Sequence, residues 1–401
     1  MQNVLCGLML TFTSMNMENI KIENFGPIKS VDISFGDLTI LVGPQGSGKS
    51  LFLELFKLIV DHTHILDTLR KYNYILSKND LRSIYDYYFG EGLNSLFTEH
   101  TKISVSDEIY SFKDILKTSK SKQATKEAVF YVPAQRILSL SDGRPKNFME
   151  FDGSAPFVLK GFSETLRVFI QSGLGNPDVI FPMRNRLKGA VKNSINKSIF
   201  HGAKVVIDQT SGQRKMKLSI GKMKLPFMTW SAGQKEFMPL LLAMYCLSGP
   251  PTSVINKKDY EWVIIEEPEM GLHPRAIQAV ILELLELMQS GYKVIVSTHS
   301  STLLEFAWVF ELLKNLNSDE LKDALCELFE IEKSCTVASI LDGLKEKKLK
   351  TYFFSSNKGG SVSTDISSLD VEDENSLVAE WGGLSSFSGK ASEVVGKYYK
   401  D

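Results

Sequence analysis

Eight residues near the start of the chain have the types and spacing of a phosphate-binding loop, G-x-x-x-x-G-K-[ST]. The loop consists of Gly43, Pro44, Gln45, Gly46, Ser47, Gly48, Lys49 and Ser50, and the expected binding set extends to Leu51. Its glycines let backbone N–H groups turn toward phosphate oxygens, and a helix start adds partial positive charge. Lys49 suits the β- and γ-phosphates, and the Ser50 hydroxyl suits Mg²⁺. The motif therefore predicts a site for ATP and Mg²⁺.

The segments on either side of this loop support that interpretation. Residues 37–42 are apolar and β-branched, which predicts a buried strand, and residues 51–60 have the pattern of a helix. A chance glycine turn is the alternative. The strand–loop–helix order favours the phosphate-binding interpretation, because the motif needs this context.

Two adjacent acids follow a second apolar run. Residues 260–265 predict a buried strand, and Glu266 and Glu267 come next. Strand ends beside a phosphate loop are where α/β sheets place metals and bases. We assign Glu266 to Mg²⁺, through water, and Glu267 to polarising the attacking water. Without the upstream loop, solvated glutamates would be an equally good interpretation.

Two further polar residues follow apolar runs. Residues 292–297 predict a third strand, and His299 comes two residues later, where an imidazole can contact the γ-phosphate. Gln135 follows the short apolar run 128–130 and is expected to bind the metal or the attacking water. A lone His is more often structural, and the role of Gln135 is supported only by its order in the chain.

A fourth motif carries a resemblance to a known family. The segment Trp230–Gln234, W-S-A-G-Q, resembles the signature motif of ABC-type ATPases. With the E-E-P-E-x-x-L-H-P pattern that starts at Glu266, the chain resembles the SMC/RecF/RecN branch, and within it the OLD-like bacterial ATPases. The resemblance covers the chain from about Met17. The chain departs from the pattern at Gln135, where relatives often have Glu.

The resemblance implies a fold, an activity and a partner. The fold is α/β: a P-loop NTPase with an ABC-type core, a mixed sheet flanked by helices, and an inserted helical lobe. The activity is hydrolysis of ATP. In such ATPases the signature caps the γ-phosphate held by the opposite protomer, and the matching residues here are Ser231, Ala232, Gly233 and Gln234. Ser231 also suits a helix N-cap. A head-to-tail homodimer, or a higher homo-oligomer, is implied.

We expect five segments along the chain. Residues 1–16 are a leader, disordered or from an over-extended gene start, and 17–60 are the first part of the core. Residues 61–228 are an inserted lobe, helical and then basic and β-rich, with the Gln135 loop returning to the core. Residues 229–310 complete the core, and 311–401 are a helical and β extension. Long heptads are absent, so no SMC-like coiled-coil arm is expected.

A basic block lies between Arg184 and Lys224, with eleven Lys or Arg residues and one acid, Asp208. Two strands joined by a turn are expected inside it, at 205–207 and 216–220. Two interpretations stay open. The block contacts a nucleic-acid backbone, with Arg214, Lys215 and Lys217 as candidates, or it is a solvated face or a dock for an acidic partner.

Composition sets wider bounds. A net charge of −1 argues against bulk electrostatic attachment to nucleic acid. Four cysteines without C-x-x-C spacing indicate neither a zinc site nor a disulfide framework, and favour a reducing cytoplasm. No run of 18 or more apolar residues is present, so no membrane span is expected.

Together these features give two main functional hypotheses. In the first, the chain is a stand-alone ATPase that controls a separate effector protein, a nuclease or toxin, in bacterial defence against phage or plasmids. In the second, it is a DNA-repair or DNA-structure-sensing ATPase of the SMC/RecF kind that binds DNA directly. A transporter ATPase is a third hypothesis, which the E-E-P-E pattern and the large insertion disfavour.

Overall fold

The computed structural model describes residues 17–76, 81–106, 108–111, 115, 126–140, 142–175, 177–209, 212–332, 340–341 and 343–398. The expected leader at 1–16 lies outside the described residues.

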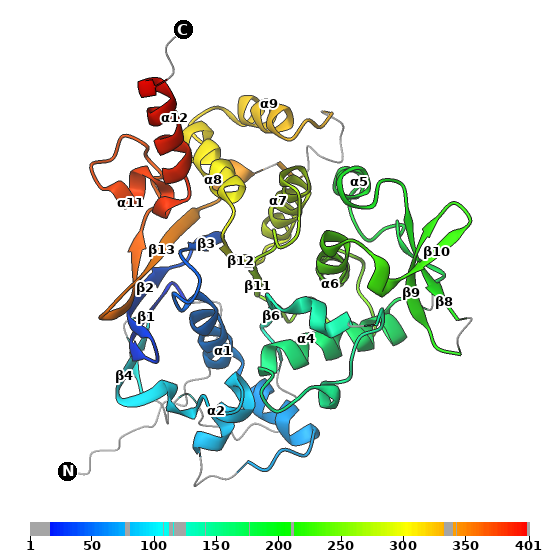
Figure 1. The fold of residues 1–401 in the computed structure, drawn as a ribbon. Coiled ribbons are helices and arrows are strands. Elements are labelled where there is room, and N and C mark those ends of the chain that lie inside the picture. Colours follow the sequence, from blue (N-terminus) through cyan, green and yellow to red (C-terminus); the bar gives the residue numbers. More distant parts are fainter. Residues whose placement is uncertain are drawn as a thin grey trace, which may run out of the picture.

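A ten-stranded mixed sheet organises the chain, in the order β5-β4-β1-β2-β14-β13-β3-β12-β11-β6 (Figure 1). Its strands are β1 (Asn19–Phe25), β2 (Ile28–Ser34), β3 (Leu38–Val42), β4 (Phe97–Val105), β5 (Glu108–Tyr110), β6 (Val129–Val132), β11 (Trp262–Glu266), β12 (Lys293–Thr298), β13 (Leu349–Asn357) and β14 (Gly360–Asp365). The five strands from β13 to β6 are parallel, whereas β1, β2, β4 and β5 pair antiparallel. The predicted α/β fold class, a mixed sheet flanked by helices, is confirmed.

The helices are α1 (Lys49–Lys71), α2 (Leu81–Phe89), α4 (Phe157–Val168), α5 (Gly189–Ile195), α6 (Ala232–Leu247), α7 (Pro274–Gln289), α8 (Ser301–Leu313), α9 (Ser318–Leu328), α11 (Ser376–Ala379) and α12 (Ser386–Tyr398). Short 3-10 or π segments are η2 (Asn94–Leu96), η3 (Arg136–Leu140), η4 (Phe148–Glu150), η5 (Phe169–Gly173), η6 (Asn196–Phe200), η7 (Phe227–Thr229), η8 (Leu344–Glu346) and η9 (Trp381–Gly383). None of these described helices is both long and apolar enough to cross a bilayer.

The parallel strands are buried on both faces, which explains their continuous apolar sequences. Ile40 and Val42 of β3 pack with α6, α7 and α8 on one face. Leu41 packs with α1 and strands β1 and β2 on the other. Side chains alternate along a strand, so each strand contributes to two separate cores.

The helix expected over residues 51–60 is confirmed, and it is longer than that range. Helix α1 continues to Lys71, with a local departure from helical geometry at Asp61. Asp61 is buried and pairs with Lys57 one turn earlier, at 2.9 Å. Its carboxylate also accepts hydrogen bonds from the backbone N–H groups of Ala128 and Val129, at the start of β6. These partners hold the helix against the sheet at the point where its geometry departs from helical.

A second, four-stranded antiparallel sheet has the order β10-β9-β8-β7 and lies beside the main sheet (Figure 1). Its strands are β7 (Val179–Phe181), β8 (Lys204–Asp208), β9 (Lys215–Ile220) and β10 (Met223–Pro226). The two strands expected in the basic block are therefore confirmed as β8 and β9. Met216 and Leu218 of β9 are buried in the same core as α6.

The C-terminal segment contributes to the main sheet rather than only covering it. Strand β13 pairs with β3, and β14 pairs with both β13 and β2. The Trp381 indole donates to the carbonyl of Leu369 at 3.0 Å and packs against Trp308, which holds this part of the C-terminal segment in place.

Helix α7 buries two acids on its inner face, Glu283 and Glu286. Burial, and then the neighbouring Glu286, raise the pKa of Glu283 to about 8, and the Ser248 hydroxyl donates to its carboxyl group. A carboxyl group with a raised folded-state pKa favours the fold while it is protonated. That contribution is lost as the pH rises from the unfolded value of about 4.5 through about 8.

We therefore predict that Glu283→Gln flattens the dependence of stability on pH. The neutral amide carries no desolvation penalty, so the variant should exceed the wild type in free energy of unfolding by about 1–3 kcal/mol at pH 9 and by much less at pH 5. Urea denaturation at both values measures this. Glu305→Gln, at an exposed position of α8, is the control. If the free energy of unfolding changes equally between pH 5 and pH 9 in Glu283→Gln and in the wild type, the prediction is contradicted.

Candidate functional site

The predicted phosphate loop connects β3 to α1 and has the backbone that its glycines allow. Gly43, Gly46 and Gly48 all have positive φ, of 145°, 73° and 87°. A Cβ at Gly43 would lie 2.3 Å from the carbonyl oxygen of Phe354 in β13. Only glycine fits where the loop passes so close to the neighbouring strand.

Lys49 lies inside this loop. Its ammonium group donates to the carbonyl oxygens of Gly43 and Pro44, at 2.7 and 3.0 Å, and to the Ser47 hydroxyl at 3.3 Å. Burial lowers the pKa of Lys49, and Glu267 is the strongest opposing influence. The loop thus holds a desolvated cation that phosphate oxygens can compete for.

Glu266 ends β11 and is turned toward Ser50. Its Oε2 accepts from the Ser50 hydroxyl and from the Ala134 backbone N–H, each at 3.2 Å, and its Oε1 accepts from the Tyr131 hydroxyl. Burial raises the pKa of this carboxyl group, and those three hydrogen bonds oppose the shift. A carboxylate and a hydroxyl at this spacing are hard oxygen donors, which fits the Mg²⁺ expected here.

Gln135 is exposed and lines a cavity of about 610 Å³ together with Ser50, Glu54 and Glu266. The structure therefore places all three predicted metal-binding residues around one cavity. Glu54 was not anticipated. It follows Ser50 by one helical turn, and burial, followed by Glu266, raises its pKa well above the ordinary value.

Glu267 points away from Glu266, because its backbone has a positive φ of 43°. Its N–H donates to the carbonyl of Ser297, and its carboxylate Oε1 lies 3.5 Å from the Nε2 atom of His299. Both side chains are about 28–29% exposed. The backbone of His299 is fixed in turn, since its N–H donates to Glu269 at 2.6 Å. The predicted base and the predicted phosphate sensor are therefore neighbours.

Ser231 is the N-cap of α6, as its position predicted. Its hydroxyl accepts from the Gln234 N–H, and the Gln234 side chain accepts from the Ser231 N–H, both at 3.3 Å. Ser231 and Ala232 are exposed. Gly233 packs so closely on the turn after the acidic motif that a Cβ would lie 2.4 Å from the Gly271 carbonyl oxygen. The signature thus presents an exposed helix start supported by the acidic segment.

Arg136 is the functional residue that the sequence analysis missed. It is fully buried, and its Nη1 and Nη2 atoms donate to the carbonyl oxygens of Glu266 and Glu267, at 2.9 and 3.1 Å. Its Nε donates to the carbonyl of Glu236 in α6, at 3.1 Å. One guanidinium therefore joins the acidic motif to the signature helix. Burial lowers the pKa of Arg136, and the Glu236 side chain is the largest opposing influence.

Several cations of the basic block are paired with nearby acids. Asp208 contacts both Lys217 and Lys224, and Asp142 lies 3.2 Å from Lys215. Arg214 is exposed. The three candidate contacts lie together on and beside β9, and Lys215 and Lys217 pair with acids.

Comparison with known proteins gives two family matches. Residues 15–140 match an "AAA ATPase domain", and residues 206–305 match an "AAA domain, putative AbiEii toxin, Type IV TA system". The Old nuclease of Escherichia phage P2 is 38% identical over 72 residues, which are 18% of this chain. That match spans only 12% of the relative's length.

Solved structures with similar folds include SMC heads and an ABC cassette. The SMC head bound to the C-winged helix domain of ScpA has a TM-score of 0.39 and 14% identity, and covers 87% of this chain and 97% of its own. The SMC head domain from Thermotoga maritima has a TM-score of 0.35 and 11% identity, and covers 87% of this chain and 98% of its own. A dimeric bacterial ABC transporter cassette has a TM-score of 0.31 and 12% identity, and covers 72% of this chain and 90% of its own. The fold class is given by this chain's own ten-stranded mixed sheet.

The geometry around Arg136 predicts a defect in turnover rather than in nucleotide binding. Arg136→Lys keeps the charge but cannot reach three carbonyl oxygens, so the acids should shift while the phosphate loop is kept. A displacement of about 1 Å costs on the order of a hundredfold in kcat. ATPase kinetics and ATP titration separate the two effects, and thermal unfolding checks the fold.

Arg186→Gln is the matched control, because Arg186 also donates to main-chain carbonyls, those of Tyr245 and Pro250. Wild-type kcat in Arg136→Lys, or an equal loss in Arg186→Gln, would show that Arg136 has no particular role in the site.

The two matched ATPase-domain models and the geometry of the site agree. The first model spans the phosphate loop and Gln135, and the second spans the signature, the acidic pair and His299. The chain also resembles the Old nuclease over 72 residues. Its two ATPase-domain matches, one on each side of the site, identify it as an ATPase.

Proposed function

We propose that this ATPase binds ATP with Mg²⁺, closes head to tail as a homodimer, and uses that closure to control a separate effector protein. The exposed signature carries the proposal. Ser231 and Ala232 begin a capped helix of 16 residues whose positive end is open to solvent. An exposed, positively polarised helix start suits the terminal phosphate of a nucleotide held by a second copy.

Hydrolysis would use the residues of one protomer and the signature of the other. Lys49 exchanges the carbonyl oxygens of Gly43 and Pro44 for phosphate oxygens. Glu267 accepts the proton of the attacking water, and His299 positions that carboxylate and contacts the γ-phosphate. Ser50 and Glu266 would hold Mg²⁺, which would supply positive charge against the phosphates.

Arg136 supports a link between hydrolysis and the dimer. Its guanidinium holds the carbonyls of Glu266 and Glu267 on one side and that of Glu236 on the other. A shift of the acids on loss of the γ-phosphate would therefore reach the signature helix. In the proposed dimer this helix contacts the partner's nucleotide, so each hydrolysis event weakens the opposite half of the interface.

The effector and the biological role are suggested by the relatives. One matched family is described as a putative toxin of a toxin–antitoxin system, and the Old protein is named a nuclease. We propose that the effector is a nuclease or toxin on another chain, and that the pair acts in the cytoplasm against phage or plasmids.

Direct action on DNA, as a repair or structure-sensing ATPase, is the second candidate, and the basic block favours it. If the block binds a phosphate backbone, replacing Arg214, Lys215 and Lys217 with Glu should abolish retention on DNA at low salt. Lys197→Glu with Lys222→Glu, at exposed positions outside this triplet, is the control. Retention that survives the triple change would reject this candidate.

The central prediction concerns Glu267→Gln. The variant keeps the phosphate cradle but loses the carboxylate base, so ATP with Mg²⁺ should double its mass in solution and hydrolysis should nearly stop. Light scattering with and without nucleotide measures the mass. Lys49→Ala should bind no ATP and stay a single protomer, and Glu305→Gln should behave as the wild type.

The trapped state also tests the effector. Purified from its own operon, Glu267→Gln with ATP should retain a second protein that Lys49→Ala does not. A monomer under all conditions would contradict the dimer, wild-type hydrolysis would contradict the base, and absence of any associated chain would contradict the effector.

A further inference from the structure

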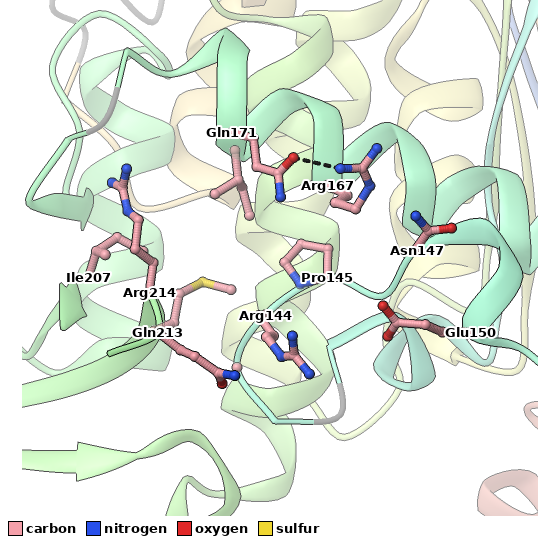
Figure 2. Close-up of a pocket in the computed structure, with 12 residues that line it drawn as sticks. Arg144, Pro145, Asn147, Glu150, Arg167, Gln171, Ile207, Gln213 and Arg214 are labelled. Carbon is pink, nitrogen blue, oxygen red and sulfur yellow. Dashed lines mark hydrogen bonds between the residues drawn. The ribbon is translucent and has the colours of Figure 1, made fainter. Parts of the chain in front are cut away.

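A second cavity lies away from the phosphate loop, between the segment after η3 and the small sheet. Its volume is about 430 Å³, within the range of about 300–1,000 Å³ typical of small-molecule sites. The lining residues are Gly143, Arg144, Pro145, Asn147, Glu150, Arg167, Ile170, Gln171, Ile207, Gln213, Arg214 and Met216. Figure 2 shows the three arginines spread around the cavity rather than grouped.

Two of these arginines are held in place from behind. Arg167 donates to the Glu164 carboxylate through Nε and Nη2, at 2.8 and 2.7 Å, and to Gln171 through Nη1, at 2.6 Å (Figure 2). The Nε of Arg144 donates to Asp142 at 3.0 Å. Within the described residues, the two terminal nitrogens of Arg144 have no hydrogen-bond partner. These two nitrogens can therefore donate a pair of parallel hydrogen bonds to one phosphate group.

The rest of the lining indicates what else a ligand carries. Ile170, Ile207 and Met216 supply an apolar wall, and the Asn147 and Gln213 amides can donate or accept. Glu150 is the single carboxylate among the twelve lining residues, and it suits hydroxyl or amino donors. An apolar wall, amides and one acid fit a ring and a sugar better than they fit a bare inorganic anion.

Charge favours one phosphate over many. The lining has three arginines and one glutamate, but Asp142 and Glu164 stand behind two of the arginines. The region is therefore close to neutral, and short hydrogen bonds rather than long-range attraction must select the ligand. A polyanion gains little from such a site.

The cavity contacts both halves of the ATPase site. Gly143 in its wall receives a hydrogen bond from the Met216 N–H at 2.9 Å, and its own N–H donates to Leu140, the last residue of η3. Arg136, which holds the acidic motif, begins that same η3 segment. A Cβ at Gly143 would lie 2.9 Å from Phe227, whose ring packs 4.9 Å from that of Trp230, next to the signature.

From this arrangement we propose that the cavity is a second ligand site, which binds a nucleoside phosphate with Arg144 at the phosphate and Arg214 in the wall, and adjusts ATP hydrolysis through η3. The ligand is either a free nucleotide or the 5′-phosphate end of a nucleic-acid strand, because both present the same chemistry. The site is separate from the phosphate loop and does not depend on dimer formation.

Binding is tested with full-length protein and the monophosphates AMP, GMP, CMP and UMP. At least one should bind to the wild type and to Lys49→Ala by calorimetry, and the corresponding nucleoside should not. The double variant Arg144→Gln, Arg214→Gln should weaken binding about tenfold or more, as expected when charge-assisted hydrogen bonds are lost. Lys197→Gln with Lys222→Gln, which removes two exposed charges elsewhere, should not.

A short 5′-phosphorylated oligonucleotide and its unphosphorylated counterpart separate the two sources. Tighter binding of the phosphorylated strand than of any monophosphate identifies a strand end, and the reverse identifies a free nucleotide. The bound ligand should also change the kcat of the wild type and leave that of the double arginine variant unchanged.

Three results would overturn the proposal. They are no binding of any probe, binding that the double arginine variant retains, and binding that Lys49→Ala abolishes. The last would assign the ligand to the phosphate loop. Each leaves the dimer and effector proposals standing, because those are read from the mass of Glu267→Gln. An unchanged kcat with bound ligand would overturn the regulatory role.

Discussion

The position of the catalytic segments depends on one buried guanidinium, that of Arg136. A buried charge needs hydrogen-bond partners, and here they are three main-chain carbonyls. The nearby carboxylates that favour the charged guanidinium are those of Glu236, Glu269, Glu267 and Glu266. Because carbonyls belong to the backbone, the guanidinium fixes where two segments lie and not merely how two side chains point. The acidic strand end, the signature helix and the loop with Gln135 are thereby held as one body. Any coupling between the acidic motif and the signature helix can therefore pass directly through Arg136.

The acids themselves are separated by backbone conformation. Adjacent residues at a strand end point to opposite faces, and the left-handed conformation of Glu267 adds a turn. Glu266 is consequently buried beside Tyr131 and Ser50, whereas Glu267 stays partly exposed beside His299. Burial raises the pKa of the Glu266 carboxyl group, and a bound divalent cation would favour its ionised form. Glu267 is partly exposed, so its carboxylate can contact water. The backbone conformation at these two adjacent residues thus gives two identical side chains different surroundings.

The sequence predicted what is local and periodic. The strand–loop–helix at Gly43–Ser50, the N-cap at Ser231 and the strands ahead of Glu266 and His299 follow from spacing within a few residues. Arg136 could not be predicted in this way. Every residue has a main-chain carbonyl, so the sequence does not show which carbonyls accept the hydrogen bonds of the guanidinium. The contacts that hold α1 beyond residue 60 could not be predicted either, because only the fold brings the start of β6 to Asp61. The strand order, with β13 and β14 inside the sheet, depends on contacts between residues more than 300 positions apart.

The placement of β13 has a consequence for how the molecule is made. Strand β3, which leads into the phosphate loop, lies between β12 and β13, and the loop at Gly43 rests on the carbonyl of Phe354. A ribosome that has produced the loop must add roughly 310 more residues before that support emerges, which at about 5–20 residues per second takes on the order of 15–60 seconds. During that time the nascent polypeptide has an incomplete cradle for triphosphate. The proposed nucleotide-driven pairing of protomers would thereby be deferred until translation of each copy is almost finished.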